Sequence, residues 1–213
     1  MGLKTEILKI KGDWMEVVDD CRATVGKESL GKEPSVAFKK KILLAEHSPI
    51  RDIIFKWRWR NIAHWITVHW VRHKWEKFVQ TQRSDRTGIP REKLPQDEPQ
   101  TFTGEANVQA LIDTMRKRLC FQASPETRRY AEDLKTAIHA VEPEISDVLV
   151  PNCVYRCGCP EMTKCPLAEV SLSGKSYWET LMSLSGDKVF SSDLQKRYDA
   201  YNEVFWKGRD RER

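Results

Sequence analysis

A dense run of cationic and amide side chains between residues 72 and 86 is the strongest chemical signal in this sequence. Arginine can bind a phosphate group through two parallel hydrogen bonds, whereas lysine offers a single point charge. So many cations close together repel one another unless an anion binds among them, so the run predicts a site for a phosphorylated ligand. The alternative is a basic hairpin that only faces solvent. The donors are Arg72, His73, Lys74, Lys77, Gln80, Gln82, Arg83 and Arg86.

The second half of this run is expected to be extended. In an extended chain Gln82, Ser84 and Arg86 project from one side, and Thr81 and Arg83 project from the other. Donors on both sides of one segment suit a ligand that is held between subunits. Arg91 follows in a proline-rich loop, where the pattern alone indicates a solvated side chain.

Two histidines with helical spacing lie at the start of the run. His69 and His73 are four residues apart, which places them on one face of a helix. Such a pair could bind a metal ion, but the neighbouring cations would repel one. We therefore favour the alternative, in which one ring packs in the protein and the other faces a ligand.

A further polar stripe follows one face of a helix expected at residues 106–119. Asn107, Leu111, Thr114 and Arg118 fall on this stripe at 3.6 residues per turn. Asn107 and Arg118 could therefore hydrogen-bond an extended ligand that lies along the helix. Arg118 adjoins apolar residues and is expected to be partly buried, where it needs a partner. That partner is either a ligand or a carboxylate of the same chain.

Four cysteines near residue 160 could form a metal site. Cys153, Cys157, Cys159 and Cys165 have the spacing C-x3-C-x-C-x5-C. Four thiolates in one short loop can bind zinc tetrahedrally, although zinc sites more often use pairs of C-x2-C steps. An iron–sulfur cluster is a further option. The alternative is a turn rich in reduced thiols.

The elements that would position these residues indicate an α+β fold, with a small, mostly antiparallel sheet flanked by helices. Residues 53–60 alternate between aromatic and cationic side chains, as a half-buried strand does. Residues 87–104 hold three prolines and two glycines and are expected to be a loop. We expect one main unit at residues 1–170, with a Cys-rich loop at 151–166, and a helical extension at 171–213. The other expected elements are a strand at 7–10, an extended segment at 78–82, and helices at 62–74, 106–119 and 124–141.

The composition and length indicate a globular protein of one domain and exclude few functions. The chain has 213 residues and a net charge of +5, which fits an anionic small ligand better than a coat on nucleic acid. It has no apolar run of about 18 residues, so no membrane span is expected. Because no apolar signal core precedes the six cysteines, we expect reduced thiols and a cytoplasmic location.

Several short motifs, taken in order, resemble those of the flavin-dependent thymidylate synthases. That family has a Glu-His pair, an Arg-His-Arg motif, a Glu-x-Ser-x-Arg element, an Ala-Arg-x-x-Leu-Pro segment, a helix from Asn to Arg, and an Ala-Gln-x-Glu-x-Arg turn. The resemblance covers residues 5–145. The matching pieces are Glu46-His47, Arg72-His73-Lys74, residues 82–86, residues 90–95, Asn107 to Arg118, and residues 123–128.

The resemblance implies an enzyme that methylates dUMP at C5 with FAD, NADPH and methylenetetrahydrofolate. It also implies a homotetramer that shares FAD between subunits. Arg118 would polarise the uracil ring as negative charge develops on it. Since G-x-G-x-x-G is missing, a flavin would not sit in a Rossmann fold. The implied FAD ligands are His47, Arg72, His73, Lys74, Asn107 and Gln109, and the implied dUMP ligands are His69, Gln82, Ser84, Arg86, Arg91 and Arg118.

Three departures from the family pattern keep alternatives open. Lys74 stands where the family has an arginine, His69 where it has a glutamine, and Gln109 where an arginine is common. The segment before Ser84 is also longer, so Gln82 could take the place of that serine. The product could therefore be hydroxymethylated, or the chain could bind a nucleotide without catalysis. A third alternative is a zinc-stabilised nucleic-acid-binding module that stacks bases on its Trp side chains.

Overall fold

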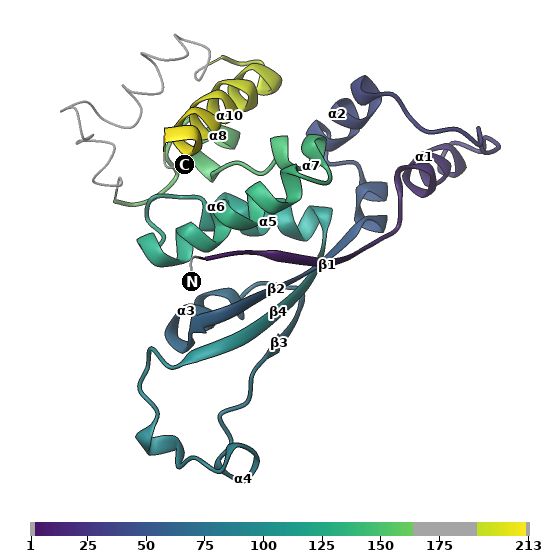
Figure 1. The fold of residues 1–213 in the computed structure, drawn as a ribbon. Helices are drawn as coiled ribbons and strands as arrows, with labels where there is room; N and C mark the ends of the chain where they lie inside the picture. Colours follow the sequence, from purple (N-terminus) through teal and green to yellow (C-terminus); the bar gives the residue numbers. More distant parts are fainter. Residues whose placement is uncertain (1–2, 164–190, 212–213) are drawn as a thin grey trace.

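A four-stranded antiparallel sheet in the order β1-β2-β4-β3 forms the centre of the structure (Figure 1). The computed structural model describes residues 3–163 and 191–211. The sheet and its flanking helices confirm the expected α+β class. The strands are β1 (Glu6–Lys11), β2 (Ile54–Ala63), β3 (Glu76–Val79) and β4 (Pro99–Asn107).

The alternating pattern of β2 determines which face of the sheet is the core. Phe55, Trp57 and Trp59 are fully buried, whereas Arg58 and Arg60 lie on the outer face. The Trp side chains of β2 are therefore core residues, as we expected, and they are not exposed for base stacking.

Helices cover one side of the sheet, and sequence signals explain where several of them begin. Asp13, Ser35, Asn107 and Ser124 each accept hydrogen bonds from backbone amides in the first turn of the following helix. Figure 1 shows α5 and α6 lying together above the strands. The helices are α1 (Trp14–Ala23), α2 (Val36–Leu44), η1 (Ser48–Asp52), α3 (His64–Trp70), α4 (Ser84–Thr87), η2 (Arg91–Lys93), α5 (Val108–Arg118), α6 (Pro125–His139), α7 (Pro143–Asp147), α8 (Asn152–Arg156) and α10 (Leu194–Arg211).

The expected C-terminal extension is helical where it is described, and α10 packs against the main unit. Arg197 is buried and donates to the carbonyls of Val154, Tyr155 and Ser191 at 2.6–2.9 Å. Tyr198 and Tyr201 belong to the same buried cluster as the sheet residues. The expected boundary at residue 170 lies outside the described residues.

Three local expectations were wrong. Residues 99–107 form β4 instead of part of a loop, because they pair with both β2 and β3. The helix expected at 62–74 is α3, which covers only His64–Trp70, since Ile62 still pairs with Gln100 in the sheet. The chain after β3 is not extended throughout, because it forms the single helical turn α4.

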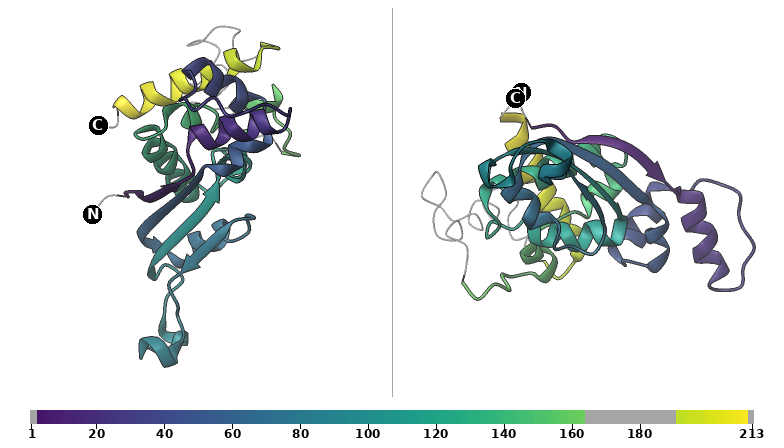
Figure 2. Two further views of the ribbon diagram at one scale, coloured as in Figure 1. Left: turned by 90° about the vertical axis from the view of Figure 1, so that its right-hand side faces the viewer. Right: turned by 90° about the horizontal axis from the view of Figure 1, so that it is seen from below.

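The connection between β3 and β4 forms an arm that leaves the body of the molecule. Residues 80–98 contain α4 and η2, and Figure 1 and the left view of Figure 2 show this segment projecting beyond the end of the sheet. The arm is held internally, with the amide of Arg91 donating to Ser84 Oγ at 3.0 Å. Among the described residues, no helix is long and apolar enough to cross a membrane.

Candidate functional site

A turn of five residues between α3 and β3 is fixed against α5, and it carries the central residues of the candidate site. Trp75 at the end of this turn is buried, and its indole donates to Thr114 Oγ1 at 3.0 Å. Thr114 in turn donates to the carbonyl of Ala110 within α5. Trp70 at the end of α3 is also fully buried. These anchors at both ends hold His73 above the last turn of α5.

Arg118 is held at this point by two acceptors of its own chain. Its Nε donates to His73 Nε2 at 2.7 Å, and its Nη2 donates to the carbonyl of His69 at 2.5 Å. The expected burial of Arg118 is confirmed, but its partners are an imidazole and a carbonyl instead of a carboxylate. Burial and the nearby Arg72 guanidinium lower the pKa of Arg118.

The hydrogen bond from Arg118 fixes the protonation state of His73. A ring nitrogen that accepts a hydrogen bond carries a lone pair, so His73 is neutral and its proton sits on Nδ1. Burial, followed by the charges of Arg118 and Lys77, lowers the pKa of His73 to about 4. The ring lies parallel to that of Trp75, with 5° between the planes and 6.4 Å between the centroids.

His69 is oriented by a second hydrogen-bond chain, which reaches α6. Its Nδ1 lies 2.7 Å from Thr127 Oγ1, and Ser124 Oγ donates to the same oxygen at 2.8 Å. Thr127 is fully buried, so once it accepts from Ser124 its own proton can be donated to His69. Burial, then Arg118 and Arg72, lower the pKa of His69. The sequence motifs gave Thr127 no role, although Ser124 just before it marks the start of a helix.

The structure thus brings His69, His73 and Arg118 together but corrects how they meet. His69 lies in α3, whereas His73 follows the end of that helix, so the two do not share a helical face. Arg72 and Lys74 flank His73 in the turn and are both exposed. The result is a half-buried guanidinium beside two neutral imidazoles, with the exposed cations Arg72 and Lys74 at its edge. Such an arrangement stabilises negative charge on a bound ligand.

The residues expected to bind the phosphate of a nucleotide lie elsewhere in the chain. Ser84, Arg86 and Arg91 are exposed on the arm, and Gln82 is partly buried at its base. Figures 1 and 2 show the arm extending away from α5, so one protomer does not bring these residues to Arg118. Arg86 has a carboxylate neighbour, Asp85, only at 3.8 Å.

The remaining expected flavin ligands gather near the opposite end of α5. Gln109 and Arg118 are nine positions apart, which is roughly 14 Å along a helix. Asn107 caps the helix by accepting from the amide of Ala110 at 2.9 Å. Gln109 donates to Glu46 Oε2 at 2.7 Å, and the exposed His47 lies 4.0 Å from Cys21 Sγ. Gln109 is therefore already engaged within its own chain.

The expected stripe along α5 is not open to a ligand over its whole length. Leu111 and Thr114 are buried, so only the two ends of the stripe reach the surface. The middle of the stripe therefore packs in the core and does not line a groove. Arg116, which had no place in the expected site, lies on the other side of α5 and forms an ion pair with Glu46. Its guanidinium also stacks 3.7 Å from the centroid of the Tyr155 ring.

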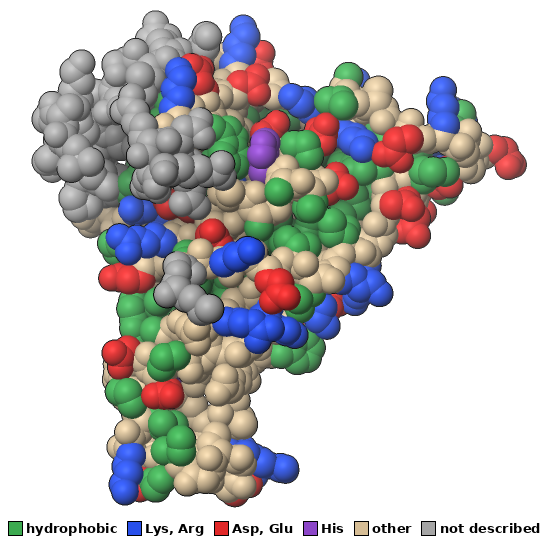
Figure 3. All heavy atoms as spheres, in the orientation of Figure 1, with side chains coloured by type: hydrophobic (Ala, Val, Ile, Leu, Met, Phe, Trp, Pro, Cys, Tyr) green, Lys and Arg blue, Asp and Glu red, His purple; other side chains and the backbone are tan. Residues whose placement is uncertain are grey.

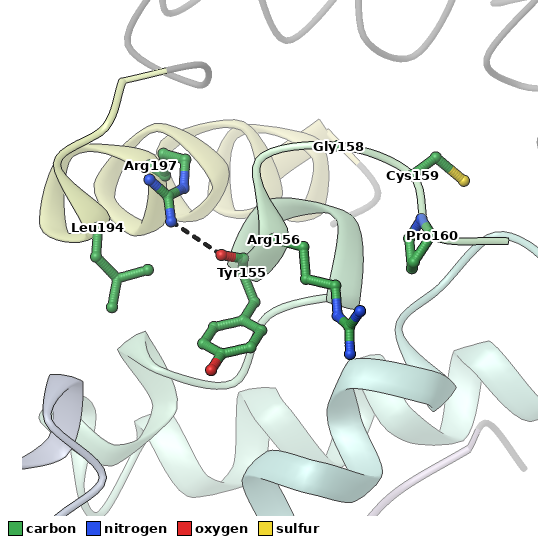
Figure 4. Close-up of a pocket in the computed structure, with 7 residues that line it drawn as sticks. All are labelled: Tyr155, Arg156, Gly158, Cys159, Pro160, Leu194 and Arg197. Atoms are coloured by element: carbon green, nitrogen blue, oxygen red, sulfur yellow. Dashed lines mark hydrogen bonds between the residues drawn. The ribbon is translucent and has the colours of Figure 1, made fainter.

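The Cys-rich segment is only partly within the described residues. Cys153 lies in α8, and Cys157 follows it with a left-handed φ of 55°. Cys165 lies outside the described residues, so the expected four-thiolate site is not tested. In residues 3–163 and 191–211, no group of three or more His, Cys, Asp or Glu side chains could hold a metal ion. Figure 4 shows Cys159 at one end of a pocket whose other end is formed by Leu194 and Arg197.

Comparisons with known proteins place the fold but not the activity. No family model matches the chain, and no curated protein matches it either. Among solved structures, it is similar to the UMP/dUMP methylase PolB from Streptomyces cacaoi, bound with 5-Br dUMP. The TM-score is 0.57 and the sequence identity 14%, over 69% of this chain and 94% of that chain. At this identity the likeness shows the shared α+β fold alone.

Proposed function

We propose that this chain is a pyrimidine nucleotide methylase that converts dUMP to dTMP with a flavin, NADPH and methylenetetrahydrofolate. The observation that carries the proposal is the Arg118 guanidinium, which His73 and the His69 carbonyl hold half-buried in one orientation. The likeness in fold to a UMP/dUMP methylase supports a pyrimidine nucleotide as the substrate. The order of the sequence motifs supports the flavin-dependent form of the reaction.

Arg118 would act on the pyrimidine ring. For C5 to attack a one-carbon unit the ring must be electron-rich, and its enolate-like form carries negative charge on the ring oxygens. Two nitrogens of Arg118 are bound within the chain, which leaves Nη1 for an external acceptor as far as the described residues show. A guanidinium fixed beforehand stabilises that charge without reorganising during the reaction. A proton must then leave C5, so release of the C5 hydrogen reports the reaction.

The residues around His73 fit a flavin dinucleotide. Arg72 and Lys74 are exposed cations suited to its diphosphate, and His73 keeps its Nδ1–H as a donor. Asn107 uses its carbonyl oxygen as a cap, so its amide N–H groups stay available. Gln109 fits less well because Glu46 engages it. When bound and reduced, the flavin supplies the hydride that completes the methyl group.

The arm would complete the substrate site from a neighbouring subunit. Ser84, Arg86 and Arg91 are exposed donors that suit a phosphate, but they lie away from Arg118 in the same chain. A segment that projects from the body can reach the site of another copy. This supports a homotetramer in which one protomer grips the phosphate and another holds the pyrimidine.

The test is tritium release from dUMP labelled at C5, measured with NADPH and methylenetetrahydrofolate. We expect release from a protein that purifies with flavin absorbance. Binding of dUMP without release would instead support a nucleotide-binding protein that has lost the reaction. A bound metal with neither flavin nor dUMP binding would contradict the proposal altogether.

A further inference from the structure

A basic pocket lies beside the start of β1, and its lining is separate from the candidate site. It has a volume of about 530 Å³ and lies between the start of β1, the irregular part of β2 and α6. It shares no lining residue with the Arg118 cluster or the arm. Figure 3 shows Lys and Arg side chains gathered on this part of the surface, beside the start of β1. Its polar lining consists of Lys4, Glu6, Arg58, Arg60, Asn61 and Tyr130.

The pocket has more positive charge than its own carboxylate can neutralise. Lys4, Arg58 and Arg60 face a single carboxylate, Glu6, among the lining residues. Glu6 lies 3.6 Å from Arg60, and both side chains are about half exposed, so this pair contributes little. Asp133 accepts from the backbone amide of Thr5, and its charge also reaches Tyr130, so it adds a second carboxylate against the three cations and leaves the positive charge in excess.

Thr103 positions the Arg58 side chain at Nε, and its two terminal nitrogens are possible donors to a ligand in the pocket. Its Nε donates to Thr103 Oγ1 on the neighbouring strand at 3.3 Å, which holds the side chain along the sheet. In the part of the chain that the structure describes, no carboxylate forms an ion pair with Arg58. An arginine fixed at Nε presents its two terminal groups as a fork, the geometry that binds a phosphate.

An irregularity in β2 places two consecutive side chains on this pocket. The register with β4 shifts between Trp59 and Ile62, and Asn61 has a left-handed φ of 57°. A regular strand alternates its side chains, but here both Arg60 and Asn61 are exposed. Bulges of this kind redirect side chains and often lie near functional sites.

Tyr130 supplies a flat apolar wall. Its ring packs edge-on against Trp59 with the centroids 5.2 Å apart, so the buried core supports it from behind. A cluster of cations beside an oriented aromatic ring suits a ligand with a phosphate and a flat heterocycle. We propose that this pocket binds such an organic phosphate, with the phosphate between Arg58 and Arg60 and the ring against Tyr130.

The experiment compares two probes, ADP and inorganic pyrophosphate, by isothermal titration calorimetry on the full chain. We expect Arg58→Ala and Arg60→Ala each to raise the Kd of both probes at least tenfold. Tyr130→Leu should raise the Kd of ADP and leave that of pyrophosphate unchanged, because only ADP carries a ring. Arg118→Ala should change neither, which separates this pocket from the proposed dUMP site.

Lys9→Ala provides the matched control, since Lys9 is exposed, opposes Lys56 in the sheet and does not line the pocket. It removes the same charge and should change either Kd less than twofold. Equal losses in Lys9→Ala and Arg58→Ala would reduce the effect to net charge and overturn the proposal. So would the lack of saturable binding of both probes, or binding of pyrophosphate without ADP.

Discussion

The Arg118 cluster and the arm are both basic, but the chain treats their charges in opposite ways. Arg118 is half-buried, and two hydrogen bonds within the chain fix its guanidinium. On the arm, Arg86 and Arg91 are exposed, and the residues beside them belong to the arm itself. Under the proposed function, the charge that acts on the reacting ring is fixed in advance, while the charge that grips the phosphate is positioned by assembly.

The largest expected effect comes from removing the fixed guanidinium of Arg118. Replacing Arg118 with alanine removes the group that stabilises charge on the ring, so we expect tritium release to fall by about 10²- to 10³-fold. Flavin absorbance should remain, because Arg72 and His73 are unchanged. Lys117→Ala is the control, since Lys117 is the exposed neighbour on the same helix. An Arg118→Ala variant with normal turnover would refute the role of this residue.

The next effect tests the arm. Arg86→Ala and Arg91→Ala each remove a charge-assisted hydrogen bond to the phosphate, so the KM for dUMP should rise by about tenfold or more. Thermal unfolding should hardly change, because both side chains are exposed. Lys93→Ala, also exposed on the arm, should leave the KM near that of the wild type. If all three variants raise the KM equally, the arm acts only through its net charge.

Acid should loosen the Arg118 cluster and leave the arm unaffected. The pKa of His73 is about 4 in the folded protein, against an ordinary value of 6.5. Between these values the unfolded chain binds a proton that the folded chain does not, so stability present above pH 6.5 is lost as the pH falls towards 4. We expect a loss on the order of 2 kcal/mol in the free energy of unfolding. His73→Gln, whose amide oxygen can still accept from Arg118, should lack this part of the pH dependence. The free energy of unfolding in urea would be measured for both proteins between pH 6.5 and 4, and an equal loss in the two would contradict the prediction.

The smallest effect concerns the hydrogen bonds behind His69. Thr127→Val removes the hydroxyl between Ser124 and His69, which should cost about 1–2 kcal/mol of stability in urea unfolding. Since His69 is expected to face the substrate, the KM for dUMP should also rise a few-fold. Thr127→Ser should restore both values. Thr136→Val, the same change later in α6, should cost less and leave the KM unchanged.

Local signals predicted the parts of the fold that depend on local chemistry. The alternation in β2 identified its buried aromatic face, and the helix start expected at residue 124 is where Ser124 caps α6. In contrast, β4 was missed because Gly104 and the nearby prolines indicated a loop. Gly104 is in fact required inside the strand, since a Cβ there would lie 2.4 Å from a ring atom of Trp57. That requirement arises from a residue 47 positions away and cannot be read locally.

Three residues of the Arg118 cluster were among those predicted from the motifs, but the geometry of the cluster was not predicted. The motifs pointed to His69, His73 and Arg118, and these do meet. Helical periodicity suggested that the two histidines share a helix, but α3 ends at Trp70. The bond from Trp75 to Thr114 on α5 sets the path of the chain after that point. Long-range contacts of this kind also explain why the role of Thr127 was not foreseen.

The most direct test of the central claim asks whether one protomer holds the pyrimidine while another supplies the phosphate grip. Arg118→Ala and Arg86→Ala proteins would be dissociated, mixed and reassembled, with subunit exchange verified by native mass spectrometry. Tritium release from C5-labelled dUMP is then compared with that of each parent. We predict release well above the sum of the two parents, because some sites combine an intact Arg118 with an intact arm. A mixed assembly no more active than its parents would contradict the shared site.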